Sequence, residues 1–65
     1  MKPQIYTIQE AERLGYRSIT TAYDERDETE MKYLANVLRD MIGIDHCIIK
    51  NNRWIEVGRL KNEVL

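Results

Sequence analysis

The sequence predicts a single two-layer α+β domain over residues 1–65, in which one long helix packs on one face of a three-stranded mixed sheet. Three observations predict this class. Apolar residues recur at three- and four-residue steps within residues 31–41, as on the buried face of a helix. Residues 16–23 are rich in β-branched and aromatic side chains, and two further apolar runs flank Asn51-Asn52. With a short helix before the first strand, the predicted order is αβαββ.

The first element is a short helix over residues 7–14. Thr7 and Glu10 have the spacing of a capping box, in which each side chain binds the other residue's backbone N–H. Gly15 follows as a left-handed stop. One apolar face is predicted from Ile8, Ala11 and Leu14. Because a helix of about two turns is not stable alone, it must dock on the rest of the domain.

The segment "GYRSITTAY", residues 15–23, fits either a strand or the second helix of a helix-turn-helix. As a helix it has only Ala22 as a strong helix former and no apolar stripe. As a strand it offers five good β formers: Tyr16, Ile19, Thr20, Thr21 and Tyr23. The strand is favoured, and it becomes the first strand of the sheet.

The second helix is the long one and ends before Gly43. Asp27 and Glu30 repeat the capping-box spacing, and acidic residues crowd the first turn, where the helix dipole favours them. Its apolar stripe is predicted from Met31, Leu34, Val37, Leu38 and Met41.

A hairpin follows, made of "IDHCIIK" and "RWIEVGRL" around Asn51-Asn52. Two asparagines can supply the positive φ angles of a type I′ turn, which would place Lys50 opposite Arg53 and Ile48 opposite Ile55. One face of the hairpin then carries Ile44, His46, Ile48, Ile55 and Val57, and the other carries Cys47, Ile49 and Trp54. Both faces are therefore partly apolar.

The last strand either lies at the sheet edge or inserts between the first two strands as a split βαβ unit. Insertion is preferred because this strand is the most apolar. The predicted core comprises Leu14, Ile19, Leu34, Val37, Leu38, Met41, Ile48, Ile55 and Val57.

The second face of the sheet raises the main functional question. Either the first helix and the Ile5-Tyr6 segment cover it, or it is a contact surface for a partner protein or a second copy of the chain. The sequence favours a non-enzymatic protein-interaction module, a possible homodimer. Its candidate contact residues are Tyr16, Arg17, Tyr23, Ile49, Arg53 and Trp54.

Charge is distributed unevenly along the chain, although the total is only −1. Residues 24–30 hold five acids and one base, whereas residues 46–61 hold four bases and one acid. The basic part allows an alternative function, a small nucleic-acid-binding regulator that uses Arg17, Lys50, Arg53 and Arg59. The acidic part allows a third, an inhibitor that presents residues 24–30 to a basic groove of another protein.

Several other classes are not expected. The single Cys47 permits no internal disulfide, which fits a reducing compartment, and adjacent His46 and Cys47 would point to opposite faces of a strand, so no metal site is expected. No glycine-rich phosphate loop or nucleophile with a partner base indicates an enzyme or a cofactor. The chain lacks an apolar run long enough to span a bilayer and a signal-peptide pattern, so a cytoplasmic location is expected.

Two resemblances add to this picture. The run "TIQEAERLG" resembles the first helix of excisionase-type and MerR-type DNA-binding domains, which implies a recognition helix at "YRSITTAY" and a wing at "IIKNNRWIEV". The supposed recognition helix is β-branched, however, and five acids follow it. Separately, "GYRSIT", the helix end "LRDM" and the aromatic-bearing final strand resemble short proteins of bacteriophages and their bacterial hosts. That resemblance implies a phage or prophage origin and brings no function with it.

Overall fold

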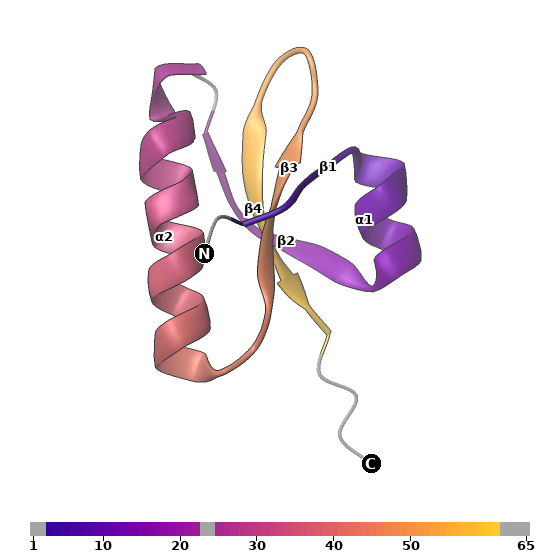
Figure 1. Ribbon diagram of the computed structural model, residues 1–65. Helices are drawn as coiled ribbons and strands as arrows, with labels where there is room; N and C mark the ends of the chain where they lie inside the picture. Colours follow the sequence, from indigo (N-terminus) through magenta and orange to yellow (C-terminus); the bar gives the residue numbers. More distant parts are fainter. Residues whose placement is uncertain (1–2, 23–24, 62–65) are drawn as a thin grey trace.

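The computed structural model describes residues 3–22 and 25–61, within which two helices and four strands form a mixed α+β domain (Figure 1). The bounds of its elements are β1 Ile5–Tyr6, α1 Ile8–Leu14, β2 Tyr16–Ala22, a 3₁₀ turn Glu25–Asp27, α2 Glu28–Ile42, β3 His46–Lys50 and β4 Ile55–Leu60. The strand over residues 16–22, which competed with a helix on sequence grounds, is thereby confirmed.

The sheet has four strands in the order β1-β3-β4-β2, so the prediction of three strands is wrong. The additional strand, β1, pairs parallel with β3 through Ile5 opposite Ile48 and Tyr6 opposite Ile49. Two residues are too few to show the alternation that marks a strand in a sequence. The prediction that the last strand inserts is confirmed, because β4 pairs antiparallel with both β3 and β2.

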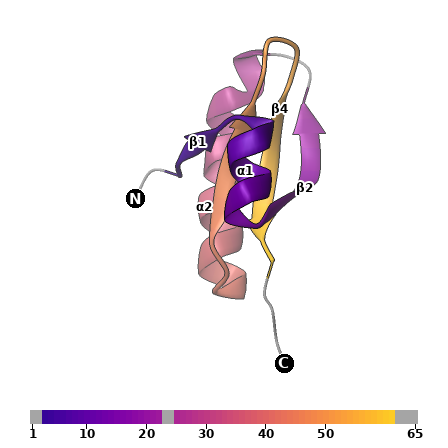
Figure 2. The same cartoon turned by 90° about the vertical axis from the view of Figure 1, so that its right-hand side faces the viewer.

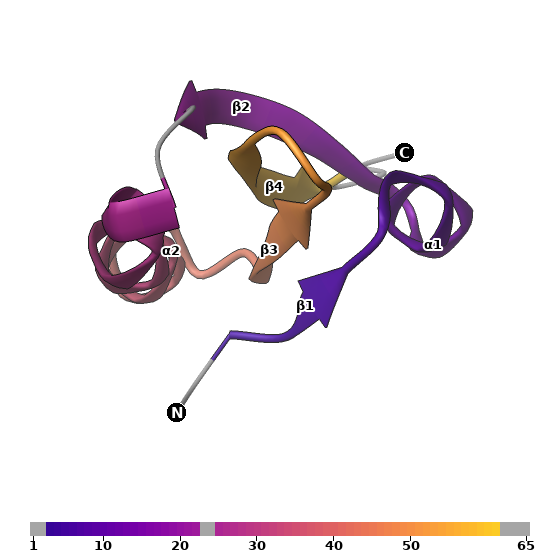
Figure 3. The same cartoon turned by 90° about the horizontal axis from the view of Figure 1, so that it is seen from above.

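The two helices lie on opposite faces of this sheet, so the predicted two-layer arrangement is also wrong. Figure 2 shows α1 in front of the sheet and α2 behind it, and Figure 3 shows the same separation from above. Met31 and Ala35 of α2 pack on Ile48, Ile55 and Val57. On the other face, α1 packs through Ala11 on Cys47 and Ile49, with Tyr6 and Tyr16 beside them. The first helix and the Ile5-Tyr6 segment therefore cover part of the second face.

The ends of α1 form as the sequence predicts. The Thr7 hydroxyl accepts the Glu10 N–H at 3.1 Å, and the Glu10 carboxylate accepts the Thr7 N–H at 3.0 Å. That backbone hydrogen bond lowers the pKa of Glu10. Gly15 ends the helix with φ 93° and directs the chain back along it as β2.

The start of α2 differs from its predicted capping box. Asp27 is the N-cap but makes no side-chain capping bond, because its φ of −83° and ψ of −1° are helical rather than extended. Glu28 holds this end instead: its carboxylate accepts hydrogen bonds from Lys50 at 2.8 Å and from Lys32 at 3.0 Å. The hydrogen bond from Lys50 lowers the pKa of Glu28 most, and the one from Lys32 lowers it further. The contact with Lys50 also links α2 to the end of β3.

The β3–β4 hairpin has a register two residues away from the predicted one, with Lys50 opposite Ile55 and Ile48 opposite Val57. The Asn51 side-chain oxygen accepts the N–H groups of Arg53 at 2.7 Å and Trp54 at 2.9 Å. No non-glycine residue in the described ranges has a positive φ, so the type I′ turn is wrong. Because side chains alternate with a period of two, a shift of two leaves each on its predicted face.

The predicted core is confirmed in its centre and wrong at two edges. Ile48, Ile55 and Val57 are buried, Ile19 and Leu34 are partly buried against them, and Val37 and Leu38 are intermediate. Leu14 is 51% exposed and Met41 76% exposed. Met41 lies roughly 120° around α2 from the buried Ala35, because each residue turns a helix by about 100°. Small Ala11, rather than Leu14, is the α1 residue that is buried against the sheet.

Gly58 of β4 lies opposite Cys47 of β3 and allows close packing on the face of the sheet that α1 covers. A Cβ atom at Gly58 would lie 2.9 Å from Cys47 Sγ and 2.9 Å from Ile49 Cδ1. The missing side chain thus leaves room for the two β3 side chains on which α1 rests.

We expect Gly58→Ala to destabilise the fold by about 1–3 kcal/mol, the usual cost of forcing an extra methyl group into a packed layer. Urea unfolding followed by circular dichroism measures this free energy. Ser18→Ala, at an exposed residue opposite Gly58 on β2, is the matched control and should change it by less than about 0.5 kcal/mol. An unchanged midpoint for Gly58→Ala would show that β3 and α1 are not held this closely.

Candidate functional site

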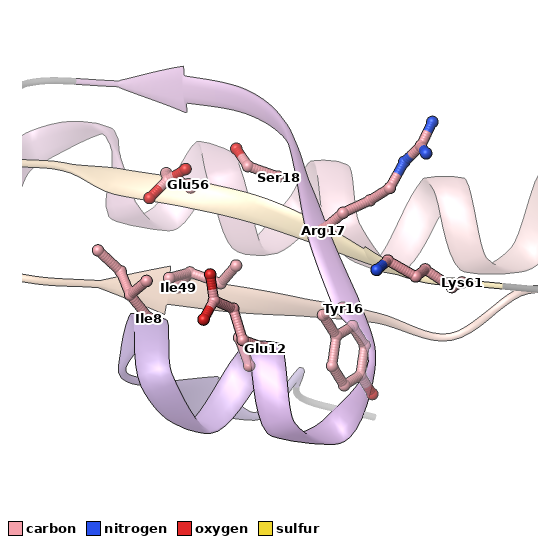
Figure 4. Close-up of a pocket in the computed structure, with 9 residues that line it drawn as sticks. Ile8, Glu12, Tyr16, Arg17, Ser18, Ile49, Glu56 and Lys61 are labelled. Atoms are coloured by element: carbon pink, nitrogen blue, oxygen red, sulfur yellow. The ribbon is translucent and has the colours of Figure 1, made fainter.

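A groove of about 450 Å³ lies between α1 and the part of the sheet that α1 leaves uncovered (Figure 4). It forms because the Gly15 turn sends β2 back beside α1, while Ala11 holds the helix mainly over β3. Its lining comprises Ile8, Ala11, Glu12, Tyr16, Arg17, Ser18, Ile49, Glu56 and Lys61.

The floor of the groove is apolar. Ala11 and Ile49 are 1% and 5% exposed, and Ile8, at the start of α1, is 40% exposed beside them. Ile49 is thus almost fully buried and lines the groove. An apolar floor of this kind favours a ligand that can place a hydrophobic group on it.

Charged groups of both signs surround this floor. Glu12 and Glu56 lie on either side of Ile49, while Lys61 lies toward the end of the groove where β2 begins, next to Arg17, whose guanidinium points away from α1 (Figure 4). The Glu56 carboxylate accepts a 2.7 Å hydrogen bond from the Trp54 indole N–H, which fixes its orientation. The groove thus has an acidic middle and a basic end.

Tyr16 forms the wall between α1 and β2. Its hydroxyl donates a 3.1 Å hydrogen bond to Asp45, and its ring lies 5.8 Å from that of Tyr6 in a tilted arrangement. Burial, followed by the charge of Asp45 and its hydrogen bond, raises the pKa of Tyr16 to about 12. Tyr16 remains a neutral donor at physiological pH and ties the start of β2 to the loop before β3.

The predicted contact residues are divided by the fold. Tyr16, Arg17 and Ile49 line the groove. Trp54 is half-buried and is not part of the lining, but its indole N–H donates a hydrogen bond to the lining residue Glu56. Arg53 is exposed at the hairpin tip and does not line the groove. Tyr23 lies outside the described residues.

The sequence interpretation missed several lining residues: Ile8, Ala11, Glu12, Ser18, Glu56 and Lys61. The sequence contains one signal, which concerns the lining residues on either side of Gly15. A left-handed Gly15 between a helix and a strand reverses the chain, so residues one turn before it and a few after it must face each other.

The alternative nucleic-acid set is also divided. Arg17 lies directly opposite Arg59 on neighbouring strands, whereas Lys50 and Arg53 belong to the other end of the hairpin. Lys50 forms an ion pair with Glu28. Residues 16–22 form a strand where a helix-turn-helix would need its recognition helix.

Two side chains capable of chemistry are buried. Cys47 is fully buried, and burial raises the pKa of its thiol to about 11, which keeps it in the unreactive protonated form. His46 is 4% exposed; its Nδ1 lies 2.7 Å from the Ile44 carbonyl oxygen, and its Nε2 lies 3.1 Å from Arg59 Nε. Within residues 3–22 and 25–61, no three His, Cys, Asp or Glu side chains gather in a metal-binding arrangement.

The raised pKa of Tyr16 predicts a pH dependence of stability. In the unfolded chain this hydroxyl ionises near pH 10.0, whereas in the fold it keeps its proton until about pH 12. The associated stability is therefore fully present below pH 10.0 and lost as the pH rises toward 12. Absorbance at 295 nm should show one tyrosine ionising near pH 12, absent in Tyr16→Phe and moved to lower pH in Asp45→Asn. An unchanged titration in Tyr16→Phe would contradict the assignment.

Comparisons with known proteins identify no relative. No protein-family model, no curated protein and no solved structure matches this chain. Neither helix, in the part of the chain that the structure describes, is long and apolar enough to cross a membrane.

Proposed function

We propose that this protein is a non-enzymatic protein-interaction module that holds a segment of a partner protein in the groove beside α1. The observation that carries the proposal is the lining: an apolar floor of Ala11 and Ile49 within a rim of charges of both signs. Protein interfaces have this anatomy, with an apolar centre surrounded by polar groups that select the partner.

The charges of the groove support a protein segment over a nucleic acid. A nucleic-acid strand presents one negative charge per nucleotide and needs a continuous basic surface. Here Glu12 and Glu56 stand in the middle of the groove and would repel phosphates. A peptide can match both signs, with an acid toward Lys61 and a base toward the two glutamates.

The positions of the chemically reactive side chains support binding rather than catalysis. Cys47 is buried and protonated. Ser18 lines the groove on the α1 side of the sheet. Cys47 and Ile49 of β3 face α1, and side chains alternate along a strand, so His46 faces the α2 side. A serine and a histidine on opposite faces of a sheet cannot act as nucleophile and base.

The proposed occupant is a short segment of another protein, in an extended or helical form, that carries at least one large apolar side chain. The exposed Ile8 lines both this groove and a neighbouring hollow beside Lys50 and Asn51, and so extends the apolar surface toward the hairpin.

A displayed library of random twelve-residue peptides tests this function. Selected peptides should bind the wild-type chain and lose most of their affinity for Ser18→Trp, which fills the groove with a side chain that a strand accommodates well. Thr29→Trp adds the same bulk at an exposed position of α2, on the other side of the sheet, and should leave binding unchanged.

Equal binding by both variants, or peptides selected for a surface outside the groove, would contradict the proposal. Light scattering after size exclusion identifies the remaining possible occupant. A dimer that Ser18→Trp dissociates and Thr29→Trp leaves intact would show that the groove binds a second copy rather than another protein.

A further inference from the structure

A second cavity, of about 390 Å³, lies at the end of the sheet where β2 begins and β4 ends. Its lining comprises Arg17, Ile44, Arg59, Leu60 and Lys61, three cationic side chains with two aliphatic ones and no carboxylate. Arg59 is half-buried between the two aliphatic residues, whereas Arg17 and Lys61 are exposed, so a solute can reach all three cationic residues.

The sheet brings two of these cations together at a cost to its own stability. Arg17 and Arg59 are directly opposite each other on β2 and β4, and Lys61 follows two residues after Arg59. Like charges in directly opposed positions destabilise a sheet. A bound anion would remove this repulsion, so the arrangement suits an occupied site better than an empty one.

A buried histidine orients Arg59. His46, which is 4% exposed, lies 3.1 Å from Arg59 Nε through its own Nε2. Since Arg59 Nε can only donate, His46 Nε2 accepts, and Nδ1 carries the proton that it donates to the Ile44 carbonyl oxygen at 2.7 Å. This neutral tautomer holds one edge of the guanidinium and leaves its two terminal amino groups for a ligand.

The acidic residue Asp45, next in the chain to the lining residue Ile44, has another partner. The Asp45 carboxylate accepts the hydrogen bond from the Tyr16 hydroxyl and does not line the cavity. Among the residues that the structure describes, none of the recorded ion pairs involves Arg17, Arg59 or Lys61. Within residues 3–22 and 25–61, the lining of this cavity therefore holds three cationic residues and no carboxylate.

We propose that this cavity binds a phosphate monoester through Arg17, Arg59 and Lys61. Such a group carries close to two negative charges at neutral pH and offers three oxygens to the donors of arginine and lysine. One compact cavity suits a single terminal phosphate. A polynucleotide would need further lysine or arginine side chains along its path. Lys50 and Arg53, however, lie at the far end of the hairpin, and Lys50 is paired with Glu28.

This site is separate from the proposed peptide groove, although Arg17 and Lys61 border both. Arg59 lines only the phosphate cavity, and Glu12 and Ser18 line only the groove. An Arg59 variant that loses phosphate binding but still binds the selected peptides would therefore support the phosphate site independently of the proposed peptide binding.

The experiment is a titration of the ¹⁵N-labelled chain with inorganic phosphate at pH 7.5, with ionic strength held constant by sodium chloride. We expect saturable shifts of the amides of Arg17, Arg59 and Lys61. Arg59→Gln and Arg17→Gln should each weaken binding about tenfold, as expected for the loss of one charge-assisted contact. Arg53→Gln removes the same charge at the other end of the hairpin and should change affinity by less than about twofold.

Further arms distinguish the sources of the phosphate. Glycerol 3-phosphate binding as tightly as a phosphoserine peptide assigns the site to small phosphate esters, and tighter binding of the peptide assigns it to phosphorylated proteins. Shifts that do not saturate, equal weakening in Arg53→Gln, or tighter binding of a short oligothymidylate would overturn the proposal. If Arg59→Gln alters the fold, as judged by its amide spectrum, Arg17→Gln provides the decisive comparison.

Discussion

The fold depends on the strand β3, which is buried on both faces. In β3, His46, Cys47, Ile48 and Ile49 are all buried, so successive side chains point alternately toward α2 and toward α1. Each helix packs on the side chains that β3 supplies, and β1 and β4 pair with its two edges. A chain of 65 residues has few apolar side chains to bury, and this strand uses its own for two helix–sheet contacts at once.

The sequence allowed the local structure to be predicted, because it is determined by neighbours in the chain. The Thr7–Glu10 capping box, the Gly15 and Gly43 stops and the β-branched strand after Gly15 all follow from local rules. The long-range pairing was harder. The side chain of Asn51 determines the hairpin turn, and β1 is a strand only because β3 offers it an edge. Neither can be recognised from periodicity, although the alternation of β3 still placed Ile48 and Ile49 on the correct faces.

The groove was predicted in part for the same reason. Tyr16, Arg17 and Ile49 could be selected as notable residues of a possible sheet surface, but Glu12 and Ser18 become significant only when Gly15 places α1 beside β2. The clustering of basic residues at the second cavity was even harder to predict from the sequence. A net charge of −1 conceals a cavity lined by three bases, because Arg17 and Arg59 are forty-two positions apart in the chain and adjacent in the sheet.

The way in which α1 rests on the sheet has a consequence for its motion. One small side chain, Ala11, is the buried residue of this seven-residue helix, whereas α2 buries Met31 and Ala35 and is linked by Glu28 to the hairpin. Elements with little buried apolar surface open at a lower free energy than the rest of a fold. Amide hydrogens of α1 should therefore exchange with solvent faster than those of α2, while the sheet stays intact. Since α1 is one wall of the groove, the same opening would let its width adjust to the occupant.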